Sequence, residues 1–185
     1  MTVRETTIPG LLVIEPRVFE DARGFFLERF HAERYAEIGV GGFVQENYSR
    51  SQAGVVRGLH FQRRHPQGKL VEVVRGRIWD VAVDLRPGSA TFGQWEGVEL
   101  DDASHRQLWV PAGFAHGFCV LSDVADVLYS CTDVYRPGDE GGVAWDDSDL
   151  GIEWPVDAPV LSAKDLGWPR LAALDRDGLP DAPAP

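Results

Sequence analysis

The sequence predicts an all-β fold, in which antiparallel strands close into a sandwich or barrel with a few short helices. Apolar and polar residues alternate in several short stretches, most clearly over residues 78–85. Turns that contain Gly or Pro separate these stretches at regular intervals, which is typical of sandwiches and barrels. A chain of 185 residues suits one domain. We therefore expect a single domain over residues 1–175 and a Pro-rich, disordered tail over 176–185.

The first part of the chain contains three strand signals and one helix signal. We expect these strands at residues 11–14, 18–19 and 25–30. The segment 21–24 has turn composition and separates the second strand from the third. Residues 31–38 predict a short helix that ends at Gly39, because glycine readily adopts the left-handed conformation that closes many helices.

The rest of the chain is dominated by strand signals. We expect these strands at residues 55–61, 70–74, 78–85, 98–100, 107–110, 118–121 and 125–134. The turn-like pair Arg75-Gly76 separates 70–74 from 78–85, so these two strands predict a hairpin. The spacing of Ser162 and Asp165 is that of a capping box, which predicts the start of a short helix or turn.

Charge and composition exclude several classes of function. The chain carries 18 basic and 29 acidic residues, for a formal net charge of −11 and a pI of about 4.8. Such a surface is unfavourable for nucleic acids and anionic membranes, since phosphate binding needs a basic footprint. The sequence has no apolar run that could span a bilayer and no signal-peptide pattern. Cys119 and Cys131 lie in apolar runs without metal or redox spacing, which favours buried free thiols and a cytoplasmic location.

Lysine is rare in this chain. Lys69 and Lys164 are the only lysines, and the other 16 of the 18 basic residues are arginine. A chain that uses arginine so freely retains lysine where a compact ammonium group is needed, or else simply reflects codon bias. Both interpretations are open at this point.

One motif bears on metal binding. The pattern Pro111-x-Gly113-x-x-His116 resembles the second motif of cupins, which supplies the last histidine of their metal site. The first cupin motif would supply His-x-His, but this chain has His60 followed by Gln62. One lost imidazole disfavours a divalent-metal site. We therefore predict no metal, and we interpret His116 as a hydrogen-bond donor to substrate or as a structural residue.

The polar stretch around His60 also raises a question of geometry. Arg57 and His60 are three positions apart, so an ideal strand would point them to opposite faces. Gly58 lies between them, and a bulge there would re-aim one side chain.

Six stretches in order resemble the signature segments of dTDP-4-dehydrorhamnose 3,5-epimerases. They are residues 57–62, 79–86, 91–95, 106–111, 113–118 and 151–155. The resemblance covers roughly residues 5–170. It implies a cupin or jelly-roll β-barrel and an enzyme that inverts C3 and C5 of dTDP-4-dehydro-6-deoxy-D-glucose to give dTDP-4-dehydro-L-rhamnose. It also implies that neither a cofactor nor a metal takes part.

The resemblance implies four catalytic residues. His60 matches the family's base, and Asp165 matches the carboxylate that pairs with it. Asp165 also fits the capping box, and the sequence does not separate these two roles. Tyr129 matches the acid, because a phenol remains protonated at neutral pH and can donate a proton. Lys69 matches the cation that stabilises the enolate oxygen.

The resemblance also implies a set of substrate-binding residues. They are Arg23, Glu28, Gln45, Asn47, Arg57, His116, Tyr135, Glu140 and Lys164. Arginine suits the diphosphate of a dTDP-sugar, because its planar guanidinium makes paired hydrogen bonds. Members of the family are homodimers with swapped N-terminal strands, so Arg23 and Glu28 are expected to complete the neighbouring subunit's pocket.

Four other functions remain as alternatives. A single-carbon epimerase or a ketoisomerase of a related dTDP-sugar would use the same scaffold. A metal-dependent cupin oxygenase conflicts with the missing His-x-His. A non-catalytic sugar-binding cupin would make the combination of His60, Tyr129, Lys69 and Asp165 a coincidence. Glu46 and Tyr48 differ from the residues common in the family, which leaves the exact sugar open.

Overall fold

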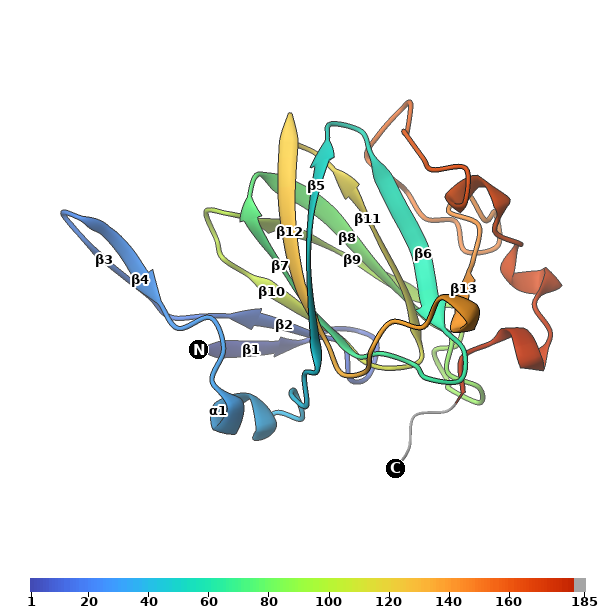
Figure 1. The fold of residues 1–185 in the computed structure, drawn as a ribbon, viewed down its shortest axis with the longest axis horizontal. Coiled ribbons are helices and arrows are strands. Elements are labelled where there is room, and N and C mark those ends of the chain that lie inside the picture. The colour runs from blue at the N-terminus through green and yellow to red at the C-terminus, as the bar shows by residue number, and fades with distance from the viewer. Residues whose placement is uncertain (182–185) are drawn as a thin grey trace.

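The computed structural model describes residues 1–181 as a sandwich of two antiparallel sheets, from which a hairpin projects (Figure 1). The larger sheet has the strand order β1-β2-β10-β7-β12-β5. Its strands are β1 (Thr2–Glu5), β2 (Leu12–Glu15), β10 (Gln107–Val110), β7 (Lys69–Arg75), β12 (Val124–Cys131) and β5 (Gln45–Gln52).

The smaller sheet has the order β13-β6-β11-β8-β9. Its strands are β13 (Glu140–Gly142), β6 (Val56–Gln62), β11 (Phe114–Val120), β8 (Arg77–Asp84) and β9 (Trp95–Asp101). The projecting hairpin consists of β3 (Val18–Asp21) and β4 (Gly24–Leu27). The helical segments are α1 (Ala32–Ala36) and four 3-10 turns, η1 (Pro137–Asp139), η2 (Asp165–Gly167), η3 (Leu171–Ala173) and η4 (Arg176–Gly178). Within residues 1–181, no helix is long and apolar enough to cross a membrane.

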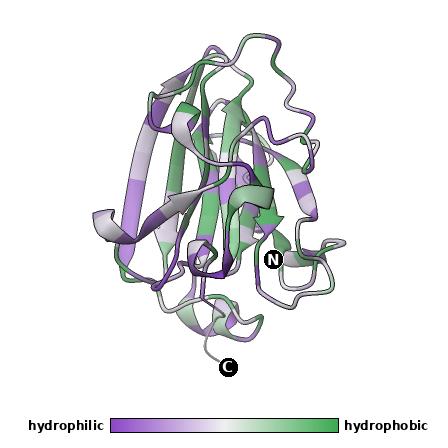
Figure 2. Cartoon of the chain, turned by 90° about the vertical axis from the view of Figure 1, so that its right-hand side faces the viewer, coloured by the Kyte–Doolittle hydropathy of each residue, from purple (hydrophilic) through white to green (hydrophobic). Residues whose placement is uncertain are grey.

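Strand β8 illustrates why the alternating sequence folds as it does. Ile78 and Ala82 point between the two sheets and belong to the main core. Trp79, Val81 and Val83 point to the opposite face, where they pack with the C-terminal segment. In Figure 2 much of the hydrophobic colour lies on the central strands. Both faces of the smaller sheet are thus covered by apolar side chains.

The predicted hairpin of residues 70–74 and 78–85 is wrong. Strand β7 pairs with β10 and β12 in the larger sheet, whereas β8 pairs with β11 and β9 in the smaller one. Gly76 between them has a positive φ of 82°, and a Cβ added there would lie 2.1 Å from the Val124 carbonyl oxygen. The glycine therefore forms a tight corner at which the chain passes from one sheet to the other.

The C-terminal segment covers the outer face of the smaller sheet. Ile152, Trp154, Leu171, Leu174 and Leu179 pack against that face. This segment continues past residue 175 into η4, and the Asp181 amide donates to the Arg63 carbonyl oxygen at 2.6 Å. The disordered tail was expected over residues 176–185, of which 182–185 lie outside the described residues.

Candidate functional site

A cavity of about 330 Å³ opens between the two sheets, and side chains from both sheets line it. This volume lies at the small end of the range for ligand pockets. Ten of the predicted site residues line the cavity, namely Gln45, Asn47, Arg57, His60, Lys69, His116, Tyr129, Tyr135, Glu140 and Lys164. Asp165 lies behind His60 and contacts it. The fold therefore brings together residues that are up to 120 positions apart in the chain.

A bulge in β6 explains how Arg57 and His60 reach the same cavity. The pairing of β6 with β11 shifts register between His116 and Phe118. Gly58 has a φ of +131°, and a Cβ there would lie 2.5 Å from the Gly117 Cα. Only glycine fits such a close approach of two backbones. The predicted bulge at Gly58 is confirmed.

His60 and Asp165 form a short hydrogen bond. The His60 Nε2 lies 2.5 Å from the Asp165 Oδ1, and the Asp165 side chain is only 4% exposed. Burial acts to raise the pKa of Asp165, but hydrogen bonds from His60 and Ser162 outweigh it and hold that pKa below its usual range. The ionised carboxylate only accepts hydrogen bonds, so the His60 Nε2 is the donor of this bond.

Asp165 uses different atoms for its two predicted roles. Its backbone amide donates to the Ser162 Oγ at 3.1 Å, as in a helix cap. Its carboxylate contacts His60 instead of turning back to the backbone of Ser162. The cap and the carboxylate–histidine contact therefore coexist in this residue.

Tyr129 faces the cavity from β12, in the sheet opposite to the one that carries His60. Burial raises the pKa of its phenol, and the nearby Cys131 and Glu140 raise it further, whereas Arg57 lowers it. The phenol thus keeps its proton over a wide pH range and can act as a proton donor.

Lys69 brings a basic side chain to the cavity from β7. The residue is only 9% exposed. Burial lowers the pKa of its ammonium, and Cys131, Asp80 and Glu140 oppose that effect. A buried ammonium beside a reacting group stabilises developing negative charge more strongly than one in water does.

Glu140 links two other predicted binding residues at the cavity. Its Oε1 accepts from the Lys164 Nζ at 2.8 Å, and its Oε2 accepts from the Tyr135 hydroxyl at 3.2 Å. Burial and the charge of Glu140 raise the pKa of Tyr135. Burial acts to lower the pKa of Lys164, but Glu140 outweighs it and the pKa rises. These three side chains therefore form one connected polar wall of the cavity.

Strand β5 and its neighbours supply another polar wall. The Gln45 Nε2 donates to the Asn47 Oδ1 at 3.0 Å, and the Gln45 Oε1 accepts from the Tyr135 amide at 2.8 Å. The Arg57 Nε donates to the Ser51 Oγ at 2.9 Å, which fixes the guanidinium at the cavity edge. These contacts pre-orient amide and guanidinium groups that suit a polar ligand.

Gln62 lines the cavity, but the protein backbone uses its amide group. Its Nε2 donates to the His65 carbonyl oxygen at 2.8 Å, and its Oε1 accepts from the Arg136 amide at 2.6 Å. Gln62, at the position of the second metal-binding histidine of cupins, thus connects two backbone segments, at His65 and at Arg136. In the part of the chain that the structure describes, no three His, Cys, Asp or Glu side chains are grouped to hold a metal ion.

Arg23 and Glu28 do not reach the cavity of their own chain. Arg23 lies in the turn of the β3–β4 hairpin and pairs with Asp21. Glu28 follows β4 and pairs with Arg34 of α1. Figure 1 shows the hairpin extending away from the sandwich.

Sequence reasoning missed two polar groups at the site. Asp80 is fully buried on β8 and contacts His116 with both oxygens, at 2.8 and 3.0 Å. The Ser49 hydroxyl is a buried group of the cavity wall without a protein partner among residues 1–181. Ser49 follows Gln45 and Asn47 at two-residue spacing, and that strand period could have identified it.

The chain is similar to known proteins over nearly its whole length. The model of the dTDP-4-dehydrorhamnose 3,5-epimerase family matches residues 5–173. A dTDP-4-dehydrorhamnose 3,5-epimerase of Pseudomonas aeruginosa is 52% identical over 179 residues, covering 95% of this chain and 98% of the relative. The chain belongs to this family. The resemblance that the sequence motifs indicate is thereby confirmed.

Solved structures of dTDP-4-dehydrorhamnose 3,5-epimerase relatives share the fold. One is a dTDP-6-deoxy-D-glucose-3,5-epimerase from Legionella pneumophila in complex with dTDP-4-keto-L-rhamnose, with 49% identity, a TM-score of 0.95 and 99% of both chains covered. The predicted cupin-type, all-β fold is thus confirmed. A dTDP-4-dehydrorhamnose 3-epimerase of Streptomyces niveus is 44% identical over 183 residues, covering 97% of this chain and 88% of the relative. The family's sequence signature therefore extends to a relative named for inversion at one carbon.

Proposed function

We propose that the chain inverts C3 and C5 of dTDP-4-dehydro-6-deoxy-D-glucose and so forms dTDP-4-dehydro-L-rhamnose. One observation carries this proposal: His60 and Tyr129 face the same cavity from opposite sheets. Inversion at a carbon requires that a proton leaves one face of the sugar ring and another arrives at the opposite face. A base and an acid on facing walls meet this requirement.

The first step removes a proton from a carbon next to the 4-keto group. The Nδ1 lone pair of His60 accepts this proton, and the electrons of the C–H bond move into the ring and onto the keto oxygen. Asp165 holds the imidazole through Nε2 and stabilises the imidazolium that forms. Lys69 supplies the positive charge that stabilises the enolate oxygen.

The second step returns a proton from the other face. Tyr129 donates its phenolic proton to the carbon, and the electron pair of the enolate forms the new C–H bond. This leaves His60 protonated and Tyr129 ionised, and proton exchange with solvent restores both. The same pair then acts on the second carbon after the ring has reoriented in the cavity.

The nucleotide part of the substrate carries the binding energy for this chemistry. Arg57 and Lys164 are cations on the cavity wall and suit the two phosphates. Gln45 and Asn47 offer amide groups for the polar edges of thymine or sugar. This basic lining offsets the net charge of −11, which would otherwise repel an anionic ligand.

A homodimer with exchanged N-terminal segments would use the β3–β4 hairpin. Phe25 and Phe26 on this hairpin are 60% and 69% exposed, which is unusual for large apolar side chains in a monomer. In our proposal the hairpin packs on a second copy, and Arg23 reaches the partner's cavity. The two buried free thiols suit a reducing compartment, and we place the reaction in the cytoplasm.

Complementation of two impaired variants tests the shared site. If Arg23 acts in the partner's cavity, co-expressed Arg23→Ala and His60→Ala subunits form heterodimers with one intact site. The mixture should recover roughly a quarter of the wild-type turnover, since half of the dimers are mixed and each has one working site. A mixture no more active than its two components contradicts a shared site.

Deuterium incorporation tests the reaction itself. The protein is incubated with dTDP-4-dehydro-6-deoxyglucose in deuterated water, and NMR follows C3 and C5. We expect deuterium and inversion at both carbons, and neither with His60→Ala. Tyr129→Phe should still exchange protons through His60 but should lose inversion, because the acid of the opposite face is missing. Absence of exchange at both carbons in the wild type would rule out this substrate.

Inversion at one carbon is the second candidate function. The observation that favours it is the similarity to the 3-epimerase of Streptomyces niveus, which spans 97% of this chain. The same NMR experiment separates the two functions, since a single-carbon enzyme would place deuterium at only one of the two positions.

A further inference from the structure

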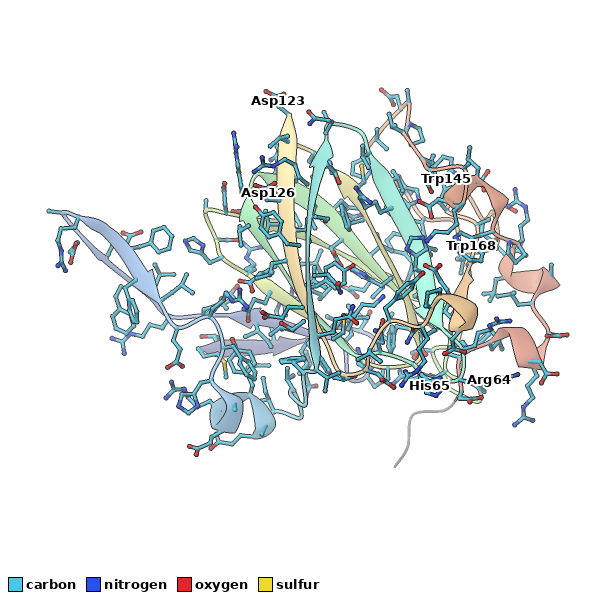
Figure 3. All side chains as sticks on the ribbon, viewed as in Figure 1. Arg64, His65, Asp123, Asp126, Trp145 and Trp168 are labelled. Atoms are coloured by element: carbon cyan, nitrogen blue, oxygen red, sulfur yellow. The ribbon has the colours of Figure 1, made fainter. Side chains whose placement is uncertain are left out.

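Trp168 lies on the side of the sandwich that carries the C-terminal segment, opposite the β3–β4 hairpin (Figure 3). The rings of Trp168 and His60 make an edge-to-face contact, with 6.2 Å between their centroids and 69° between their planes. Aromatic rings prefer this arrangement to a face-to-face sandwich. Trp168 is not among the described residues that line the cavity, so its indole contacts His60 from outside the space for the substrate.

Gly142 of β13 makes room for this indole. A Cβ added at Gly142 would lie 2.4, 2.5 and 2.6 Å from three atoms of the Trp168 ring, closer than real Cβ atoms come to other heavy atoms. Gly142 has no positive φ, so space and not backbone conformation explains the glycine. Gly142 is the cross-strand partner of His60, and paired residues point to the same face of a sheet. The indole therefore occupies the place of a side chain next to His60.

Two hydrogen bonds attach the same segment to the edge of the smaller sheet on either side of the indole. Before it, the Lys164 Nζ donates to the Glu140 Oε1 at 2.8 Å. After it, the Pro169 carbonyl oxygen accepts from the Ala144 amide at 2.8 Å. The turn that carries Asp165 is therefore attached to the sheet edge at both of its ends, and the indole lies between the two attachments.

A second tryptophan of the C-terminal segment has an ordinary structural role. Trp154 packs in the apolar cluster on the outer face of the smaller sheet, and its Nε1 donates to the Trp145 carbonyl oxygen at 2.8 Å. Within the described chain, Trp168 joins no apolar cluster, and its buried Nε1 has no hydrogen-bond partner. A buried donor without a partner is costly, so the ring contacts of Trp168 must outweigh that cost.

We propose that Trp168 is a positioning residue, whose indole holds Asp165 and His60 in the geometry of their hydrogen bond. The edge-to-face contact restricts rotation of the imidazole, and the packing on Gly142 anchors the turn that carries Asp165. Trp168 thus acts through two other residues and not on the substrate. Its effect on turnover rests on the proposed function, whereas its effect on the hydrogen bond does not.

The proton of the His60–Asp165 hydrogen bond gives a direct test. In protein labelled with ¹⁵N at histidine, a proton in so short a bond resonates downfield of the amide protons, and its loss in His60→Asn assigns it. Trp168→Ala should move this signal upfield or remove it through exchange with water, because the bond is no longer held. Trp168→Phe keeps an aromatic ring and should retain the signal. An unchanged signal in Trp168→Ala would overturn the proposal.

Trp154→Ala is the matched control, since it truncates a tryptophan of the same segment that lies outside the cavity wall. This variant should lower thermal stability at least as much as Trp168→Ala does, but the downfield signal should stay. Loss of the signal in both variants would show that any weakening of the segment disrupts the bond, and it would overturn a specific role for Trp168.

A reciprocal change at Gly142 tests the contact without removing the tryptophan. Gly142→Ala places a methyl group against the indole and should weaken the downfield signal as Trp168→Ala does. In the double variant the methyl group has space, so Gly142→Ala should add nothing to the effect of Trp168→Ala. Additive effects would contradict the proposal. In the unaltered protein, nuclear Overhauser effects should connect the ring protons of Trp168 and His60, and their absence would overturn the proposal even if no variant folds.

Kinetics separate this proposal from the proposed function. Trp168→Ala should lower kcat at least about tenfold with little change in KM, because a misplaced base slows the chemical step. In an Asp165→Asn background the same change should cost less than about twofold, since Trp168 acts through the bond to that carboxylate. An equal loss in both backgrounds would overturn the proposal. A signal lost in Trp168→Ala, without turnover of the dTDP-sugar by wild type, would contradict the proposed function alone.

Discussion

The His60 Nε2 and the Asp165 Oδ1 are 2.5 Å apart, although 105 positions separate the two residues in the chain. His60 belongs to a strand of the barrel, whereas Asp165 opens a 3-10 turn of the C-terminal segment. Trp168, just after this turn, lies near the His60 ring and covers Gly142, where a Cβ would meet the indole at 2.4 Å. His60, the proposed base, is thus held by a segment that is not part of either sheet.

Loss of the proposed base should slow turnover strongly. We expect His60→Asn to reduce the rate about 100-fold or more, because general base catalysis contributes 10²–10⁴-fold. His105→Asn is the matched control, since His105 has a φ of +54° that asparagine tolerates and lies outside the cavity. NMR of the sugar measures the turnover rate of each variant. Wild-type turnover in both variants would contradict the assignment of His60 as the base.

Separate variants distinguish the two roles of Asp165. Asp165→Asn keeps the backbone cap but removes the charge beside His60, so turnover should fall at least about tenfold with a small change in thermal stability. Ser162→Ala removes the cap and should cost about 0.5 kcal/mol of stability with most of the turnover retained. The opposite pattern would make Asp165 a cap only.

Glu72 should make the protein less stable as the pH rises toward neutrality. Burial raises the pKa of this carboxyl to about 7, although Arg29, 3.0 Å away, acts to lower it. A pKa that is higher in the folded state contributes stability that is present below about pH 4.5 and is lost as the pH rises through 7. Melting temperatures of Glu72→Gln should therefore decline less than those of wild type between pH 5 and 8.

The exposed Glu99→Gln is the control for that experiment. Glu99 lies 3.7 Å from Arg77, and both side chains are about half exposed to solvent. Such a loose surface pair contributes little to stability, so the pH–stability curve of this variant should follow that of wild type. A wild-type slope in Glu72→Gln would show that other groups cause the decline.

The bulge of β6 should tolerate no side chain. Gly58→Ala would place a Cβ 2.5 Å from the Gly117 Cα, at a φ of +131° that favours glycine. We expect a loss of stability of more than about 1 kcal/mol and a loss of turnover, because Arg57 and His60 would no longer share one cavity. Gly138→Ala is the control, since nothing lies within 4 Å of its added Cβ. Chemical denaturation and turnover of both variants test this expectation.

The sequence predicts local features of this fold better than the pairing of its strands. Alternation over residues 78–85 predicts a strand, and the structure has β8 there, with both of its faces covered. Pattern reasoning joins this strand to β7 through Gly76, but the two belong to different sheets. A short glycine turn serves a hairpin and a corner between sheets equally well, and only long-range packing decides between them.

The residues of the candidate site likewise fall into those that sequence motifs identify and those that only the folded structure reveals. The family motifs point to His60, Tyr129 and Lys69, which the fold brings to one cavity. Sequence reasoning does not identify Asp80, because an aspartate is an ordinary polar residue in a strand of alternating polarity. Its place at the site becomes visible only through its contact with His116, which is 36 positions away and on another strand. Arg23 is the reverse case, since it matches a motif but lies outside the cavity of its own chain.

The attachment of base and acid to opposite sheets has a consequence for how regiochemistry evolves. The gap between His60 and Tyr129 is set by the thickness of the apolar layer between the sheets, to which Val73 and Val127 contribute without lining the cavity. A larger or smaller side chain in that layer moves the acid relative to the base without altering any residue that touches the sugar. Enzymes with identical cavity residues can therefore differ in which carbon they invert, and libraries aimed at new product stereochemistry should vary the interior of the sandwich as well as its mouth.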